Sequence, residues 1–152
     1  MGDAGPALRE AALRLLARRE HSQRELAQKL RKRFPDIPGE RLEAEIKALA
    51  EAGYQSDERR QESLIRQAEL RGQGPGRLEA KLRASGLPPP ESPEDPAALE
   101  ARLAALQQQR FGGAPADAKA WQKQARFFAY RGFPSWLIRR RLGEIPWGDS
   151  EA

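Results

Sequence analysis

The glycine-rich stretch RGQGPGRLEA at residues 71–80 is the part of this chain closest in composition to a phosphate-binding loop. A P-loop needs Lys and then Ser or Thr after its last glycine, whereas Gly76 is followed by Arg77 and Leu78. A dinucleotide-binding fingerprint follows a strand, and the sequence predicts none here. We interpret the stretch as a turn that leads into a helix. A phosphate site at the start of that helix is the lesser alternative.

No other group of residues has the composition of a catalytic or metal site. The chain has no cysteine and one histidine, His21, which excludes thiolate chemistry and argues against zinc. Ser22 lies beside His21, but a serine at this position is better suited to cap a helix than to act as a nucleophile. We therefore expect His21 to lie exposed in a turn, and we expect no enzyme activity, no cofactor and no bound metal.

The elements that would position any site are helices. Val and Thr are absent from the sequence, so residues that favour strands are scarce. Apolar residues recur at the three- and four-residue spacing of one helix face, at Leu42, Ile46 and Leu49 and again at Leu99, Leu103 and Leu106. The sequence therefore predicts an all-α fold.

Two sequence patterns predict where helices begin. Ser22 and Glu25 have the spacing of a capping box ahead of an apolar helix face. Ser92 precedes Pro93 and two acidic residues, which predicts a helix that Ser92 caps. The proline-rich segment at residues 86–93 predicts a connector before it.

The chain contains an internal repeat. Three stretches align without gaps, each opening with Arg, with a residue suited to a helix cap three positions later and apolar residues after that: REHSQRELAQKL (19–30), RGQGPGRLEAKL (71–82) and RGFPSWLIRRRL (131–142). Flanking helical patterns extend each stretch toward a three-helix unit. We therefore predict tandem three-helix repeats at residues 7–54, 55–112 and 116–147, the last one truncated.

Basic charge concentrates on the second helix of each repeat. Residues 22–33, 74–85 and 134–145 carry net charges of +4, +2 and +2, against +5 for the whole chain, whose pI is about 10.0. Such a surplus can be a solvated helix face, but the same bias in three aligned segments favours a stripe that binds phosphates. The candidate DNA- or filament-binding residues are Arg24, Lys29, Arg31, Lys32, Arg33, Arg77, Lys81, Arg83, Arg139, Arg140 and Arg141.

The last repeat is rich in aromatic residues. Their helical spacing predicts that they form a core rather than a base-stacking surface. Trp147 is predicted either to pack on the truncated repeat or to anchor a partner. The aromatic residues, most of which we predict to be core, are Trp121, Phe127, Phe128, Tyr130, Phe133 and Trp136.

Four segments occur in a specific order and spacing: ALRLLARREHSQRELAQKL, GYQSDERRQESLIRQ, RGQGPGRLEAKLRASG and RFFAYRGFPSWLIRRRL. With these segments, from about residue 7 to 143, the chain resembles the RecX family of RecA regulators. Gln55 and Arg60 differ from the residues common at those positions in the family. The resemblance implies an elongated, curved array of three-helix units. It also implies a non-enzymatic regulator that binds the RecA recombinase filament on single-stranded DNA and restrains it in homologous recombination, DNA repair and the SOS response.

Other features set the remaining expectations. We expect no membrane contact, because no apolar run is long enough to span a bilayer. The absence of cysteine fits a reducing cytoplasm, and we expect a monomer. Double-stranded DNA is a second candidate ligand. Two alternatives stay open: a stand-alone DNA-binding protein of tandem helix-turn-helix-like units, and a helical scaffold that binds no nucleic acid.

Overall fold

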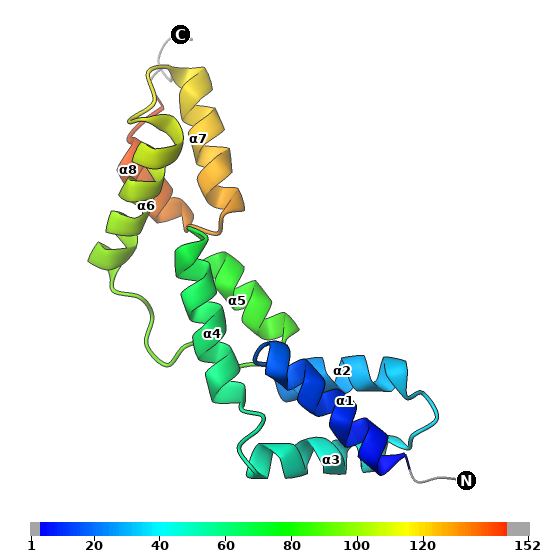
Figure 1. Ribbon diagram of the computed structural model, residues 1–152. Helices are drawn as coiled ribbons and strands as arrows, with labels where there is room; N and C mark the ends of the chain where they lie inside the picture. Colours follow the sequence, from blue (N-terminus) through cyan, green and yellow to red (C-terminus); the bar gives the residue numbers. More distant parts are fainter. Residues whose placement is uncertain (1–3, 146–152) are drawn as a thin grey trace. The chain divides into compact units, whose positions relative to one another are not determined.

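The computed structural model describes residues 4–145, and all regular secondary structure in this range is helical (Figure 1). The predicted all-α class is confirmed. The helices are α1 (Gly5–Arg18), α2 (Gln23–Arg33), α3 (Gly39–Glu51), α4 (Asp57–Leu70), α5 (Pro75–Ala84), α6 (Pro96–Phe111), α7 (Ala118–Tyr130) and α8 (Ser135–Leu142).

The helices pack as two units. The first contains the residues up to Leu64 together with Lys81–Pro89, and the second contains Ile65–Ala80 together with the residues from Pro90 onward. Helices α1, α2 and α3 thus belong to the first unit and α6, α7 and α8 to the second, while α4 and α5 each contribute residues to both.

The first unit has a leucine-rich core between α1, α2 and α3. The predicted α3 face is confirmed, because Leu42, Ile46 and Leu49 are all buried. They pack with Leu8 of α1 and Leu26 of α2 in a single cluster. Burial of a leucine side chain contributes about 1.5–3 kcal/mol, so helices this short are stable only because they share the core.

The core of the second unit is aromatic. Phe128 and Phe133 are buried with Leu103 of α6 and Leu137 of α8. The two phenylalanine rings meet edge to face with their centroids 6.4 Å apart, a favourable geometry for aromatic pairs. The sequence predicted that α6 belongs to the second repeat, whereas the buried leucines of α6 pack with residues of α7 and α8. The boundaries of the three repeats stay a prediction.

Two aromatic residues of the predicted last repeat lie at the surface. Tyr130 is 69% exposed and Trp136 is 48% exposed, so neither is among the aromatic residues that form the core. Tyr130 is the last residue of α7 and Trp136 the second of α8, and helical spacing alone did not separate them from their buried neighbours. Trp121 is half-buried, and its indole N–H donates to the carbonyl of Gly143 at 3.1 Å. Trp147 lies outside the described residues.

Helix starts agree with the repeat register. Helices α2, α5 and α8 begin directly after Ser22, Gly74 and Pro134, the three aligned cap positions. The cap predicted for α6 was wrong: Asp95, not Ser92, accepts hydrogen bonds from the first turn, and Pro96 rather than Pro93 opens the helix. The chain contains the same cap-and-proline pattern twice in succession, and the second copy forms the cap.

The glycine-rich stretch forms a turn, as predicted, and packs against the equivalent turn of the third repeat. The N–H of Gly74 donates to the carbonyl of Arg131 at 2.7 Å, and the N–H of Gly76 donates to the carbonyl of Gly132 at 2.9 Å. A Cβ on Gly74 would lie 2.6 Å from the Gly132 carbonyl. Glycines are therefore needed because two equivalent turns meet backbone to backbone, and these two N–H groups are already used.

Candidate nucleic-acid interface

Helix α2 has an apolar face and a basic face. Its capping box fixes the start of the helix, with the Glu25 N–H donating to Ser22 Oγ at 3.1 Å and the Ser22 N–H donating to Glu25 Oε1 at 2.8 Å. Leu26 and Leu30 are then buried, which turns the intervening basic residues outward. All five predicted site residues of this helix are exposed: Arg24, Lys29, Arg31, Lys32 and Arg33.

Little of this charge is neutralised locally. Arg31 lies 3.4 Å from the Glu43 carboxylate, but both side chains are more than half exposed, so the pair is weak. Lys32 has no carboxylate within ion-pair distance among residues 4–145. Three cations in the last turn also face the negative end of the helix dipole, which favours them there. The last turn of α2 therefore concentrates exposed positive charge on the surface of the first unit.

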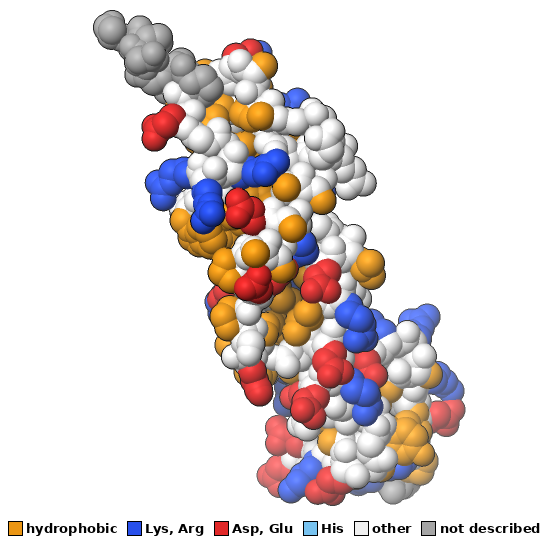
Figure 2. All heavy atoms as spheres, turned by 90° about the vertical axis from the view of Figure 1, so that its left-hand side faces the viewer, with side chains coloured by type: hydrophobic (Ala, Val, Ile, Leu, Met, Phe, Trp, Pro, Cys, Tyr) orange, Lys and Arg blue, Asp and Glu red, His pale blue; other side chains and the backbone are white. Residues whose placement is uncertain are grey.

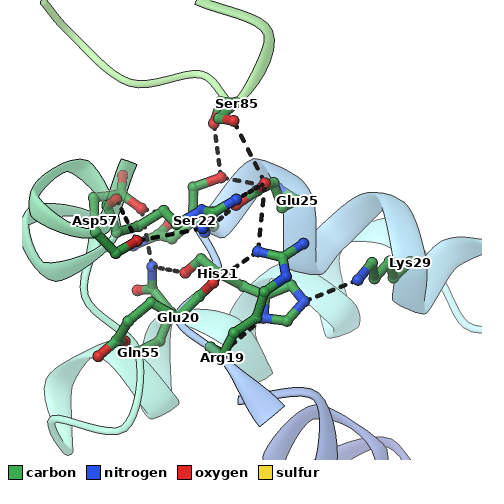
Figure 3. A network of polar contacts seen from close by, with 12 residues as sticks. Arg19, Glu20, His21, Ser22, Glu25, Lys29, Gln55, Asp57 and Ser85 are labelled. Atoms are coloured by element: carbon green, nitrogen blue, oxygen red, sulfur yellow. Dashed lines mark hydrogen bonds and ion pairs between the residues drawn. The ribbon is translucent and has the colours of Figure 1, made fainter. Parts of the chain in front are cut away.

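A buried polar network holds the start of α2 in place, and no local sequence pattern indicates it (Figure 3). Arg60 of α4 is 3% exposed and makes two hydrogen bonds to Glu25, at 2.9 and 3.0 Å. Ser22 Oγ donates to the carbonyl of buried Ser85 at 2.7 Å. These contacts connect α2 to α4 and to the segment after α5 within the first unit.

Gln55 joins the network from the turn before α4. Its side chain is buried and donates to the carbonyl of His21 at 3.1 Å and to the Asp57 carboxylate at 2.9 Å. Gln55 and Arg60 are the two positions noted in the sequence as unusual for the family. Both are buried polar residues that donate hydrogen bonds to partners 34 and 35 positions away, which the sequence alone does not reveal.

His21 is buried, so the expectation of an exposed turn residue was wrong. Only 1% of the residue is exposed, and its contacts include Lys29 of α2 and the side chain of Gln55. Burial, together with the charges of Arg19 and Lys29, lowers the pKa of His21 despite the hydrogen bond to the Arg19 carbonyl. The neutral ring therefore accepts from the Lys29 ammonium, with Nε2 and Nζ 2.9 Å apart, while Nδ1 lies 3.1 Å from the Arg19 carbonyl (Figure 3).

Helix α5 divides its predicted site residues between the two units. Lys81 and Arg83 are exposed in its last turn, in the first unit. Arg77 is half-buried in the second unit, with its guanidinium over the exposed ring of Tyr130, 4.4 Å from the ring centroid. Arg77 is therefore partly committed to packing. The alignment of the three basic clusters along one stripe stays a prediction.

Helix α8 presents three consecutive arginines to solvent, while Leu137 and Ile138 are buried beneath them. Arg141 donates to Gln107 at 2.8 Å, which holds its side chain on α6. Arg140 lies 3.6 Å from the Glu100 carboxylate in an exposed pair. Arg139 has no acidic partner within the described part of the chain.

Neither metal-binding nor membrane-spanning features occur in the described part of the chain. No three His, Cys, Asp or Glu side chains of residues 4–145 come together as metal ligands would. None of the helices in that range has the length and apolar character needed to cross a bilayer.

Comparison with known proteins gives a consistent result. Models of the first and third three-helix domains of RecX match residues 9–36 and 98–142. A protein of Halorhodospira halophila named regulatory protein RecX is 43% identical, with the alignment covering 91% of this chain and 88% of that protein. The equivalent proteins of Acidithiobacillus ferrooxidans and Pseudomonas entomophila are 43% and 39% identical over 87% and 92% of this chain and 86% and 92% of theirs.

The chain belongs to the RecX family. A crystal structure of regulatory protein RecX superposes with a TM-score of 0.70, covering 93% of this chain and 74% of that one. At 22% identity this match establishes the shared fold. The match to the first-domain family model covers the basic face of α2. The match to the third-domain family model covers most of α6, all of α7 and the three arginines of α8.

Proposed function

We propose that this RecX family member is a non-enzymatic regulator that binds the RecA recombinase and its filament on single-stranded DNA and inhibits recombinase activity. The proposal rests on family membership, since relatives over nearly the whole chain are named regulatory proteins. It places the protein in homologous recombination, DNA repair and the SOS response, in the cytoplasm, as a monomer.

Charge on the exposed helix faces supports a nucleic-acid or filament contact. The last turns of α2 and α8 each expose three consecutive basic residues on a rigid helix. Cations that neutralise phosphates release counterions, which gives sequence-independent binding that weakens with salt. We propose that the binding residues are the eleven basic residues identified in the sequence, with Arg77 contributing least because its guanidinium already stacks on Tyr130.

The decisive experiment measures ATP hydrolysis by RecA on single-stranded DNA as the purified protein is added. We expect a dose-dependent fall in the rate, because a protein bound along the filament would interfere with its turnover. An unchanged rate at saturating protein would overturn the proposal. Binding to duplexes of different sequence tests the alternative of a stand-alone helix-turn-helix-like DNA-binding protein, since base readout would distinguish the duplexes strongly.

A further inference from the structure

The second unit contains a pocket of about 600 Å³ that none of the predicted site residues lines. Its lining residues come from the end of α4, the turn after it and α6, together with Arg131 directly after α7. Four guanidinium groups line the pocket, from Arg71, Arg102, Arg110 and Arg131, against the single carboxylate of Glu69.

Three of these four arginines keep their charge uncompensated. Arg102 is neutralised by Glu94, which accepts from it at 2.7 and 2.8 Å. For Arg71, Arg110 and Arg131, no carboxylate lies within ion-pair distance among the described residues. A pocket with this much unpaired positive charge attracts an anionic group.

Two of the three guanidiniums are held in place before any ligand arrives. Arg110 and Arg131 both stack on the ring of Phe127, at 4.9 and 4.7 Å from its centroid. Arg131 also donates to the carbonyl of Arg71 at 2.8 Å, which fixes the turn that carries Arg71. Guanidiniums held in this way lose less conformational entropy on binding a carboxylate or phosphate than free side chains do.

An apolar side chain lies beside these cations. Leu70, the last residue of α4, is 87% exposed and lines the pocket with Ala105 and Leu106. Figure 2 shows one face of the molecule, on which hydrophobic side chains lie at the surface among basic and acidic ones. Arginine next to exposed apolar surface is typical of protein–protein interfaces. Contacts to a phosphate backbone are polar and would not bury an exposed leucine.

We propose that this pocket binds an acidic peptide segment of a partner protein. Its carboxylates would pair with Arg71, Arg110 and Arg131, and an apolar side chain next to them would cover Leu70. Arginine suits this role because its planar fork can bind a carboxylate through two hydrogen bonds. The proposal is independent of the DNA-binding residues on α2, α5 and α8, and it holds whether or not those residues bind nucleic acid.

The test is fluorescence anisotropy of the full chain with two probes: a labelled peptide of repeating Glu-Glu-Leu and a labelled oligothymidylate. We expect saturable binding of the peptide to the natural chain. The double variant Arg71→Glu/Arg110→Glu should weaken that binding by about tenfold or more. A double variant with the same charge change on exposed arginines outside the pocket, Arg66→Glu/Arg126→Glu, should weaken it much less.

Leu70→Ser distinguishes the two kinds of ligand. We expect it to weaken peptide binding about threefold or more and to leave oligothymidylate binding unchanged, because only the peptide buries apolar surface there. Circular dichroism of each variant checks that the helices are intact. The proposal would be overturned by absent peptide binding, by peptide affinity that the pocket variants do not alter, or by pocket variants that reduce only oligothymidylate binding.

Discussion

Arg60 Nε lies 2.9 Å from Glu25 Oε1, and Arg60 Nη2 lies 3.0 Å from Glu25 Oε2, in a two-point ion pair between α4 and the first turn of α2. The two side chains are only 4% and 15% exposed. Glu25 also accepts from the Ser22 N–H, so one carboxylate both caps α2 and pairs with Arg60. Removal of either side chain would leave the charge of the other buried without this partner.

Arg60→Ala should therefore reduce the free energy of unfolding substantially. Removal of one partner from a buried ion pair costs about 3–5 kcal/mol, because the other charge stays desolvated. Urea unfolding followed by circular dichroism measures the loss. Glu43→Ala, which removes the exposed partner of Arg31, is the matched control and should cost about 0–1 kcal/mol. Equal losses for the two variants would contradict the role assigned to Arg60.

The same carboxylate predicts acid sensitivity. Burial raises the pKa of Glu25, but the hydrogen bonds from Arg60 and Ser22 and the charges of Arg60 and Arg19 outweigh it and lower the pKa from 4.5 to about 2. The unfolded chain therefore takes up this proton at a higher pH than the folded chain does. The stabilisation is complete above pH 4.5 and is lost as the pH falls toward about 2. Thermal unfolding across this range should show a smaller loss for Glu25→Gln than for the natural chain.

His21 offers a direct measurement of pKa. It is the only histidine, so its ring signals in a proton–carbon NMR titration need no assignment. Burial and the charges of Arg19 and Lys29 should place its pKa below the ordinary value of 6.5. Lys29→Met should raise that pKa, because one of the repelling charges is removed. A pKa at or above 6.5 in the natural chain would contradict the buried neutral ring.

The close contact of the two equivalent turns predicts a strong glycine requirement. Gly74→Ala would place a Cβ 2.6 Å from the backbone of Gly132, and backbone on both sides leaves little room to adjust. We expect a loss of about 1–3 kcal/mol in the stability of the second unit. Gly39→Ala, at the start of α3 with nothing within 4 Å of the added carbon, should be neutral or slightly stabilising. Urea unfolding compares the two.

The α8 arginines predict a salt effect on binding. Arg139→Ala/Arg140→Ala/Arg141→Ala should weaken single-stranded DNA binding and reduce the slope of log affinity against log salt by roughly one unit per lost phosphate contact. The matched control removes three exposed cations of α7: Lys119→Ala/Lys123→Ala/Arg126→Ala. Normal affinity of the α8 variant at every salt concentration would remove α8 from the proposed interface.

The sequence alone determined the features that depend on neighbouring residues. Apolar spacing identified the buried face of α3, the pair Ser22 and Glu25 identified the start of α2, and the repeat register gave the starts of α5 and α8. Capping and helical periodicity act over three or four residues, so a single sequence displays them fully. The three arginines of α8 were recognisable as well, because the charge surplus of residues 134–145 can be counted within one short segment.

Only the tertiary structure decided which polar residues are buried and which apolar ones are not. Arg60 and Glu25 are 35 positions apart, and Ser22 and Ser85 are 63 apart, so no local pattern indicates either contact. The pocket at Leu70 likewise depends on α4, α6 and α7 meeting. Whether a charged or apolar side chain is exposed depends on what distant segments place over it, and that packing is settled only when the whole core forms.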